Sequence, residues 1–329
     1  MTITRKTIKA KIFKILICDL LFMVAVCYGF AQYEKISPLI VKQSFIYAVK
    51  DTNKLGLDIY HLKDADSTYK KPCVVFVFGG AFVGGRRDDS IYYKYFNSLV
   101  EHEYVVVAIS YRLGLKGAKN ISKFNINPLR NAINMAVQDV YDATNWIITN
   151  AAGFGIDTSK IILSGSSSGA ITVLESDYKR RNNDSLSKKL PYLFEYAGVV
   201  AFSGAILSYN WGIKYKIPPA PTLMFHGTAD KIVPYNKIRF LNKGFFGSGW
   251  LAKKFSKNNY PYYLYSEQGM GHEIAVLPMY ENIPVVLDFL DKFVIQKKPY
   301  QINLNFKNPD AKPVLLLTPK ELFDKLEHS

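Results

Sequence analysis

Residues 161–170 read Ile-Ile-Leu-Ser-Gly-Ser-Ser-Ser-Gly-Ala, and the rest of the chain is organised around this stretch. It begins with three apolar residues, two of them β-branched, which is typical of a buried strand. Gly165 and Gly169 then bracket Ser167 in the pattern G-x-S-x-G. Between a strand and a helix, this pattern forms a tight turn that strains the central serine and exposes its hydroxyl at the sheet edge. A Gly/Ser turn without a chemical role is the alternative, and the motif alone leaves both open.

The first 31 residues have the composition of a secretory signal. Five Lys or Arg residues lead into an apolar run over residues 20–30 that only Gly29 interrupts, and Gly29-Phe-Ala31 supplies the small residues of a cleavage site. An uncleaved anchor is the alternative, but Asp19 leaves too few apolar residues to span a bilayer. We therefore expect export with cleavage after Ala31, a periplasmic or extracellular location in a bacterium, and no stable membrane anchor afterwards.

Composition and cysteine usage predict one exported globular domain without a disulfide. The chain has 329 residues, 49% of them hydrophobic, and a net charge of +15. Cys18 and Cys27 lie in the leader, so Cys73 is left alone, and we expect it to be buried in a strand. The Lys and Arg residues are scattered and no nucleic-acid-binding signature is present, so we expect no nucleic-acid partner. We interpret the charge as a surface property, or as attraction to an acidic envelope or polysaccharide. The oligomeric state is left open.

Two stretches around the opening motif carry a resemblance to a known family. They read Asp139-Val-Tyr-Asp-Ala-Thr-Asn-Trp146 and Gly153-Phe-Gly-Ile-Asp-Thr-Ser-Lys-Ile-Ile-Leu-Ser-Gly-Ser-Ser-Ser-Gly-Ala170. They resemble the α/β-hydrolase carboxylesterases, near the hormone-sensitive-lipase-like and BD-FAE-like esterases. The resemblance covers about residues 55–293. It implies an α/β-hydrolase fold, with a mostly parallel eight-stranded sheet and helices on both faces. We expect a leader over residues 1–31, a hydrolase domain over 32–297, and an extension over 298–329 packed on that domain.

The stretch Gly79-Gly-Ala-Phe-Val-Gly-Gly85 follows a continuous apolar run that predicts a central strand covered on both faces. In the family resembled, a His-Gly-Gly-Gly loop at this place holds the developing oxyanion with backbone N–H groups. The resemblance assigns these donors to Gly80 and Ala81, with the N–H of Ser168 as a third. Phe78 stands where the family has His, so the support of the loop must differ. A glycine-rich connection without this role is the alternative.

The remaining members of a catalytic triad are expected at Asp230 and His272. His226-Gly-Thr-Ala-Asp230, followed by Lys-Ile-Val-Pro234, resembles the family's turn that carries the triad acid, which implies Asp230 as the acid and His226 as a structural residue. A nucleophilic serine also needs a base that the acid orients. His272 is assigned as this base because it comes last in the order Ser, Asp, His. Four histidines are excluded because they precede the serine, belong to the acid motif or lie next to the terminus: His61, His102, His226 and His328.

The expected reaction is acyl transfer to Ser167 and then to water, without a cofactor or metal, since the cysteines are not paired and no H-E-x-x-H motif occurs. The expected substrate is a small-molecule or polysaccharide-linked carboxylic ester, with acetyl and feruloyl esters included. One alternative is a serine peptidase of the prolyl-oligopeptidase type, for whose large N-terminal domain the chain has no room. Another is an inactive esterase-like binding protein, although such proteins have lost triad residues.

Predictions outside the motifs rest on composition alone. Tyr209 and Trp211 follow a predicted strand at the edge of the sheet where the site is expected. They either line a pocket there or take part in ordinary loop packing. Four further segments are predicted as follows: residues 176–189 as a charged solvated loop, residues 236–246 as partly helical, residues 244–259 as an aromatic and basic loop, and residues 313–326 as a strand and a short helix.

Overall fold

The structure is a computed structural model, and it describes residues 35–50, 52–63, 69–117, 125–209, 212–313, 315 and 321. The predicted leader over residues 1–31 lies outside the described residues, as does nearly all of the strand and helix predicted over residues 313–326.

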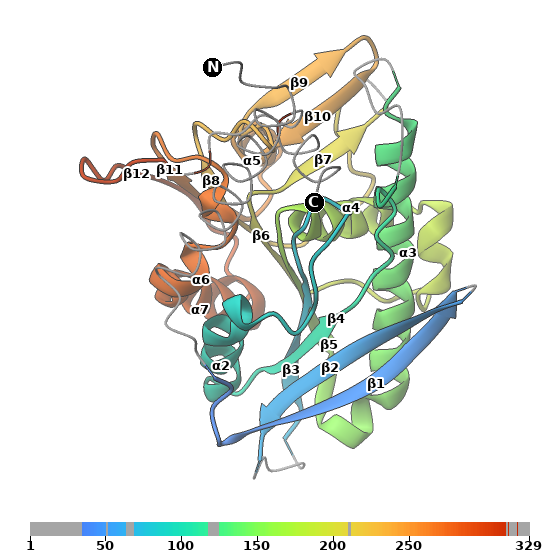
Figure 1. The fold of residues 1–329 in the computed structure, drawn as a ribbon. Coiled ribbons are helices and arrows are strands. Elements are labelled where there is room, and N and C mark those ends of the chain that lie inside the picture. The colour runs from blue at the N-terminus through green and yellow to red at the C-terminus, as the bar shows by residue number, and fades with distance from the viewer. Residues whose placement is uncertain are drawn as a thin grey trace, which may run out of the picture.

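A nine-stranded, mostly parallel sheet forms the centre of the described part of the chain (Figure 1). The first two strand pairings are antiparallel and every later one is parallel. In spatial order the strands are β1 (Ile40–Lys50), β2 (Asn53–Leu62), β4 (Val105–Ile109), β3 (Lys71–Val77), β5 (Ile156–Ser166), β6 (Gly198–Phe202), β8 (Thr222–Gly227), β11 (Tyr262–Glu267) and β12 (Gln301–Phe306).

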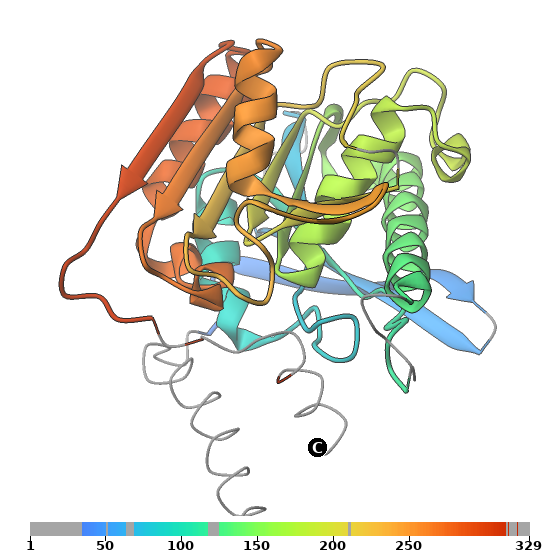
Figure 2. The same ribbon diagram turned by 90° about the horizontal axis from the view of Figure 1, so that it is seen from above.

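The last strand is one more than the eight predicted, so that count is wrong. β12 belongs to the predicted C-terminal extension and lies at the outer edge of the sheet, in parallel with β11 (Figure 2). Its sequence Gln-Ile-Asn-Leu-Asn-Phe alternates polar and apolar residues, as a strand with one covered face requires. Ile302 and Leu304 pack against the core. This part of the extension therefore completes the sheet.

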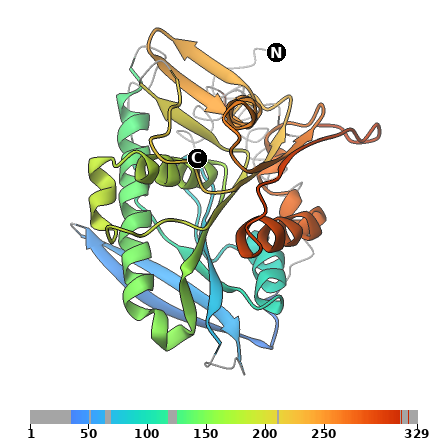
Figure 3. The same cartoon turned by 180° about the vertical axis from the view of Figure 1, so that it is seen from behind.

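Helices cover both faces of the sheet. They are α2 (Tyr93–Glu101), α3 (Asn127–Asn150), α4 (Ser168–Arg181), α5 (Ser248–Lys257), α6 (Pro278–Glu281) and α7 (Ile283–Phe289), with short 3₁₀ or π turns η1 (Ser90–Tyr92), η2 (Ala151–Phe154), η3 (Ser185–Lys189), η4 (His272–Ala275) and η5 (Leu290–Ile295). Helices α2, α6 and α7 lie on one side, and α3 and α4 on the other (Figures 1 and 3). Within the described ranges, no helix combines the length and apolar character needed to cross a bilayer.

The middle of the sheet is buried between these helical layers. Every residue from Cys73 to Val77 in β3 is fully buried, and so is the whole of β4. A continuous apolar run without alternation is what a parallel strand covered on both faces needs. Cys73 has no exposed surface, and burial raises the pKa of its thiol. The prediction that this cysteine is buried in a strand is confirmed.

The prediction of a solvated loop over residues 176–189 is wrong. Helix α4 continues to Arg181, and both Asp177 and Arg180 are buried. Arg181 Nε lies 3.0 Å from Asp177 Oδ1, and Arg180 Nε donates a hydrogen bond of 2.7 Å to the carbonyl oxygen of Phe194. Buried charges persist when they are paired or hydrogen-bonded. These partners come from the fold, so the composition of the segment does not reveal them.

The predictions for residues 236–259 are also wrong. The chain forms β9 (Lys237–Phe240) and β10 (Lys243–Gly247) in place of a helix, and then α5 in place of a loop. With β7 (Ala205–Ser208), these strands make a second, antiparallel sheet in the order β7-β10-β9. A Cβ atom at Gly247 would lie 1.6 Å from the carbonyl oxygen of Pro234, so only glycine fits there. Pairing with the distant β7 overrides the local preference.

The turn between β5 and α4 has the predicted strand-turn-helix form. Ser167 has a φ of 51° and a ψ of −116°, a strained backbone for a residue with a side chain. A Cβ atom at Gly165 would lie 2.5 Å from the carbonyl group of Gly169, and one at Gly169 would lie 2.0 Å from the carbonyl oxygen of Val77. Both glycines are required because the backbones of helix and strands touch.

We expect the Gly169→Ala variant to be strongly destabilised, because its methyl group must displace the backbone of β3. Overpacking of this kind costs roughly 1–3 kcal/mol, and occasionally more. Urea unfolding followed by circular dichroism measures the loss. Gly153→Ala is the matched control, since no atom lies within 4 Å of a Cβ there. Equal unfolding midpoints for the two variants would contradict the steric explanation.

Candidate active site

Three loops at the carboxyl ends of strands carry the predicted reactive side chains. Ser167 follows β5, Asp230 follows β8 and His272 begins η4 after β11. In a parallel sheet these ends meet at one edge, where α/β proteins build their sites. The loop that carries Asp230 and the loop that carries His272 are in contact. A Cβ atom at Gly227 would lie only 2.3 Å from the carbonyl oxygen of Gly271. The sheet therefore brings together positions that are 105 and 42 residues apart in the chain.

The three side chains form one line of hydrogen bonds. Ser167 Oγ lies 2.7 Å from His272 Nε2, and His272 Nδ1 lies 2.7 Å from Asp230 Oδ2. Ser167 is half-buried, whereas Asp230 and His272 are 8% and 7% exposed. With the ring proton on Nδ1 donated to the carboxylate, Nε2 is free to accept the serine proton. This arrangement can raise the nucleophilicity of a serine that is otherwise unreactive.

The carboxylate of Asp230 keeps its charge although it is buried. Burial alone would raise its pKa, but His272 and the hydrogen bonds from His226 and His272 hold that pKa well below the usual range. The backbone N–H groups of Ile232 and Val233 donate to its other oxygen, Oδ1, at 2.9 and 3.0 Å. Asp230 is therefore an anion with hydrogen-bond donors at both carboxylate oxygens. This suits it to orient the imidazole of His272 and to stabilise the protonated imidazole.

His226, assigned from the sequence only as a structural residue, contacts the same carboxylate. Its ring is fully buried, and Nε2 lies 3.4 Å from Asp230 Oδ2 and 3.1 Å from the carbonyl oxygen of Val233. Nδ1 lies 2.8 Å from Ser248 Oγ at the start of α5. The hydroxyl thus donates to Nδ1 and leaves the proton on Nε2, where it faces both the carbonyl oxygen of Val233 and the carboxylate of Asp230. Ser248 was missed because its link to the site exists only in the fold.

The glycine-rich loop after β3 abuts the nucleophile. A Cβ atom at Gly79 would lie 3.2 Å from Cβ of Ser167. Gly80 and Ala81 have φ angles of 133° and 53°, and their N–H groups have no hydrogen-bond partner among the described residues. Ser168 is the first residue of α4, where the N–H groups of a helix have no partner within the helix. The geometry is that of an anion site, and the assignment of the oxyanion donors stays a prediction.

Aromatic side chains support this loop where the family resembled has a histidine. The ring of Phe78 packs on Tyr111, with centroids 4.5 Å apart, and the hydroxyl of Tyr111 donates to the carbonyl oxygen of Phe78 at 3.0 Å. The N–H of Gly79 donates to the hydroxyl of Tyr92 at 3.2 Å. Two tyrosines from neighbouring elements therefore hold the backbone in place, as the departure at Phe78 requires.

A residue of the C-terminal extension contacts the base loop. Glu273 accepts a hydrogen bond from the N–H of Gly271 through Oε1 and one from the N–H of Leu315 through Oε2, at 2.5 and 3.0 Å. A Cβ atom at Gly271 would lie 2.5 Å from the carbonyl oxygen of Leu315. The carboxylate next to His272 thus ties the base loop to a distant part of the chain.

The structure describes only one of the two aromatic residues that were predicted near the site. Tyr209 lines a cavity between α3 and α4, away from Ser167, and Trp211 lies outside the described residues. Among the residues that the structure describes, no three His, Cys, Asp or Glu side chains gather in a way that could hold a metal ion.

Sequence comparisons find similarity to a family model and to relatives that include a probable esterase. Residues 57–206 match the BD-FAE family model. The chain is 32% identical over 141 residues to the cAMP-regulated D2 protein of Dictyostelium discoideum, an overlap of 42% of this chain and 25% of that protein. It is 27% identical over 266 residues to a probable isoprenylcysteine alpha-carbonyl methylesterase of Arabidopsis thaliana, with 65% and 50% covered. The chain spans half or less of the length of these relatives.

Structural comparison identifies the same fold in a thermophilic esterase from the Planctomycetes species Thermogutta terrifontis, solved with bound propionate. The TM-score is 0.57 and the identity 19%, and the match covers 76% of this chain and 94% of that one. At this identity the likeness concerns the fold. It confirms the predicted α/β-hydrolase class.

We expect the His226→Phe variant to lower the reactivity of Ser167, because Asp230 loses one of the donors that keep it ionised. A hydrogen bond to a charged group contributes about 1.5–3 kcal/mol, so labelling of Ser167 by a serine-directed fluorophosphonate should slow about tenfold or more. Labelling rates from intact-protein mass spectrometry measure this. His102→Phe, at an exposed helix end, is the matched control. Unchanged labelling of His226→Phe would remove His226 from the site.

Proposed function

We propose that the chain is a member of the α/β-hydrolase esterases and that it hydrolyses carboxylic esters through an acyl-enzyme intermediate on Ser167. The observation that carries the proposal is the hydrogen-bonded line from Ser167 through His272 to Asp230. A serine, an imidazole and a buried carboxylate in this order form the machinery of acyl transfer in several unrelated folds.

In the first half of the reaction, Ser167 Oγ attacks the carbonyl carbon of the ester while its proton passes to Nε2 of His272. Asp230 stabilises the imidazolium that forms. The negative charge on the former carbonyl oxygen is held by the N–H groups of Gly80, Ala81 and Ser168. The tetrahedral intermediate then breaks its bond to the alcohol oxygen, which takes the proton from Nε2. The alcohol leaves and the acyl group stays on Oγ.

Water completes the cycle through the same groups. His272, neutral again, takes a proton from a water molecule as the oxygen of that water attacks the acyl carbon. A second tetrahedral intermediate forms and collapses, the proton returns to Ser167 Oγ, and the carboxylic acid is released. The first and last proton transfers join Ser167 Oγ and His272 Nε2, which are already 2.7 Å apart.

We further propose that the protein is exported and that its substrates include acetyl or feruloyl esters of polysaccharides. The leader over residues 1–31 supports export, and the net charge of +15 suits acidic surfaces. The esterase relatives favour ester hydrolysis over the peptidase alternative. Activity on acetylated sugars, feruloyl esters and aryl esters of increasing acyl length, with a peptide amide as the comparison, distinguishes these substrates.

Ser167→Ala and His272→Ala should each abolish hydrolysis of a short aryl ester without loss of the fold, because each removes a group that moves the proton or forms the bond. Asp230→Asn should lower kcat by about 10⁴, since a wrong imidazole tautomer alone has this effect. Steady-state kinetics measures the loss, and circular dichroism checks the fold. If Ser167→Ala turned over at a near-normal rate, the mechanism would be wrong.

The pH profile tests the same assignment. Only neutral imidazole accepts the serine proton, so kcat/KM should rise with pH through one ionisation. Because the pKa of Asp230 is held far below its usual range, this acid should stay ionised throughout and add no second limb. Activity that required a second ionisation at acid pH would contradict the surroundings described for Asp230.

Export is tested on the protein recovered outside the cytoplasm. Amino-terminal sequencing should begin near Gln32, because Gly29 and Ala31 supply the small residues before the cut. Protein that keeps Met1 and stays in the cytoplasm would refute the proposal.

A further inference from the structure

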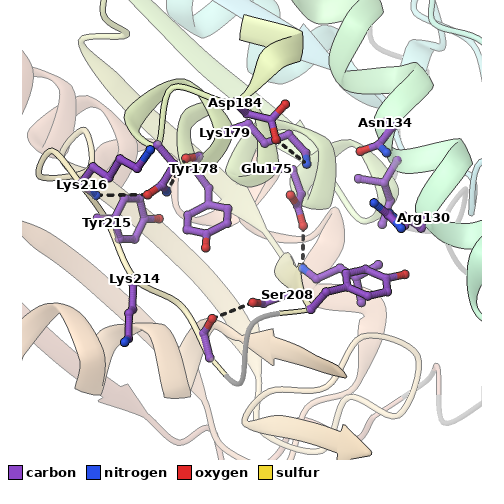
Figure 4. A pocket seen from close by; sticks show the side chains of 15 residues that line it. Arg130, Asn134, Glu175, Tyr178, Lys179, Asp184, Ser208, Lys214, Tyr215 and Lys216 are labelled. Carbon is purple, nitrogen blue, oxygen red and sulfur yellow. Dashed lines mark hydrogen bonds and ion pairs between the residues drawn. The ribbon is translucent and has the colours of Figure 1, made fainter. Parts of the chain in front are cut away.

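A cavity of about 710 Å³ lies between α4, the start of α3 and the segments 207–209 and 212–216 (Figure 4). We propose that it binds an acidic sugar, a ring that carries both a carboxylate and hydroxyl groups, as in a hexuronate unit of a polysaccharide. Binding of the sugar does not require the proposed hydrolysis. A role of the cavity in holding a polysaccharide whose ester reaches Ser167 rests on the proposed function.

The cavity has an excess of positive charge. Four cationic side chains line it: Arg130, Lys179, Lys214 and Lys216. Lys179 is neutralised by Asp184, with Nζ 3.7 Å from Oδ2. The other three have no carboxylate partner among the described residues. They lie at the exposed rim, where they attract an anion without the cost of burying an unpaired charge.

Tyrosine side chains supply an aromatic surface on which the flat face of a sugar ring can pack. Tyr178 lies in the middle of the cavity and meets Tyr215 edge to face, with centroids 5.1 Å apart (Figure 4). On the other side, the guanidinium of Arg130 lies over Tyr209, 4.7 Å from the ring centroid. The hydroxyl of Tyr209 has no hydrogen-bond partner among the described residues. Aromatic walls with a few polar groups are typical of sites for small organic ligands.

A buried carboxylate argues for a hydroxylated ligand over a bare anion. Glu175 is 1% exposed and accepts a hydrogen bond of 2.6 Å from the N–H of Leu207 through Oε1. Its other oxygen has no hydrogen-bond partner among the described residues. Burial raises the pKa of Glu175 to about 7. In its ionised form this group repels phosphate or sulfate, whereas a sugar hydroxyl can donate to it while the sugar carboxylate meets the lysines.

The cavity is distinct from the candidate active site. Glu175 lies seven residues after Ser168 on the same helix, a separation of roughly 10 Å at 1.5 Å per residue. One sugar unit in the cavity and another near Ser167 would therefore belong to the same chain, with linking units between them. The acidic unit and the ester would sit on different sugars of one polysaccharide.

Isothermal titration of the Ser167→Ala protein tests the proposal without turnover. The probes are a galacturonic acid trimer, a neutral galactose trimer and inorganic phosphate. We expect the acidic trimer to bind at one site per chain. The neutral trimer should bind at least about tenfold more weakly, because it has no carboxylate for the three cationic side chains. Lys214→Ala with Lys216→Ala should weaken the acidic trimer by a similar factor, whereas Glu175→Gln, which removes a negative charge, should strengthen the binding of phosphate.

The matched control changes two exposed lysines of α5, Lys253→Ala with Lys257→Ala, which lie away from the cavity and should leave binding unchanged. Equal binding of the two trimers, equal binding of phosphate, undiminished binding by the double lysine variant, or phosphate binding that Glu175→Gln leaves unchanged would each overturn the proposal. Aryl-ester hydrolysis by the wild-type chain is measured separately, so failure of the binding site and failure of the proposed activity are distinguishable.

Discussion

The contact between helix α4 and the strands beneath it is the constraint on which the rest of the site depends. Neither Gly165 nor Gly169 has room for a Cβ atom, so the chain reverses over Ser167 and its hydroxyl emerges at the edge of the sheet. The loops after β8 and β11 then need only reach the same edge, which parallel pairing ensures. A rigid sheet, and not closeness in sequence, brings the reactive groups together.

Two buried carboxylates show how the surroundings decide the charge. Asp230 has donors on both oxygens, from two backbone N–H groups and two imidazoles, and its pKa stays low. Glu175 has one backbone donor, from Leu207, and its pKa rises to about 7. Burial penalises both anions, and the outcome depends on the charge of His272 with the histidine donors at Asp230, and on the weaker opposition from Lys179 and one backbone donor at Glu175. The first is suited to a permanent charge, and the second to the exchange of a proton with its surroundings.

The parts of the fold that could be predicted from sequence are those in which a local pattern carries its own physical reason. The apolar run that contains Cys73 and the glycines around Ser167 are of this kind. Asp230 was predicted from the His-Gly-Thr-Ala-Asp motif, and His272 from the order of the triad residues along the chain. The charged segment of α4 was mistaken because Asp177 and Arg180 find their partners only in the folded chain. The strands β9 and β10 depend on pairing with β7, and Ser248 reaches the site through His226, so no local signal marked them.

The distance along the chain between nucleophile and base has a consequence during synthesis. Ser167 leaves the ribosome long before His272, which is 105 residues further on, and the contact of Leu315 with Glu273 forms later still. Domains generally fold as units during synthesis, so the site is assembled only when the segments that carry all three residues have emerged. A nascent or interrupted chain therefore presents a serine with no base beside it, which is as inert as any other serine. Under the proposed mechanism, reactivity therefore arises only once the loop that carries His272 has joined the fold.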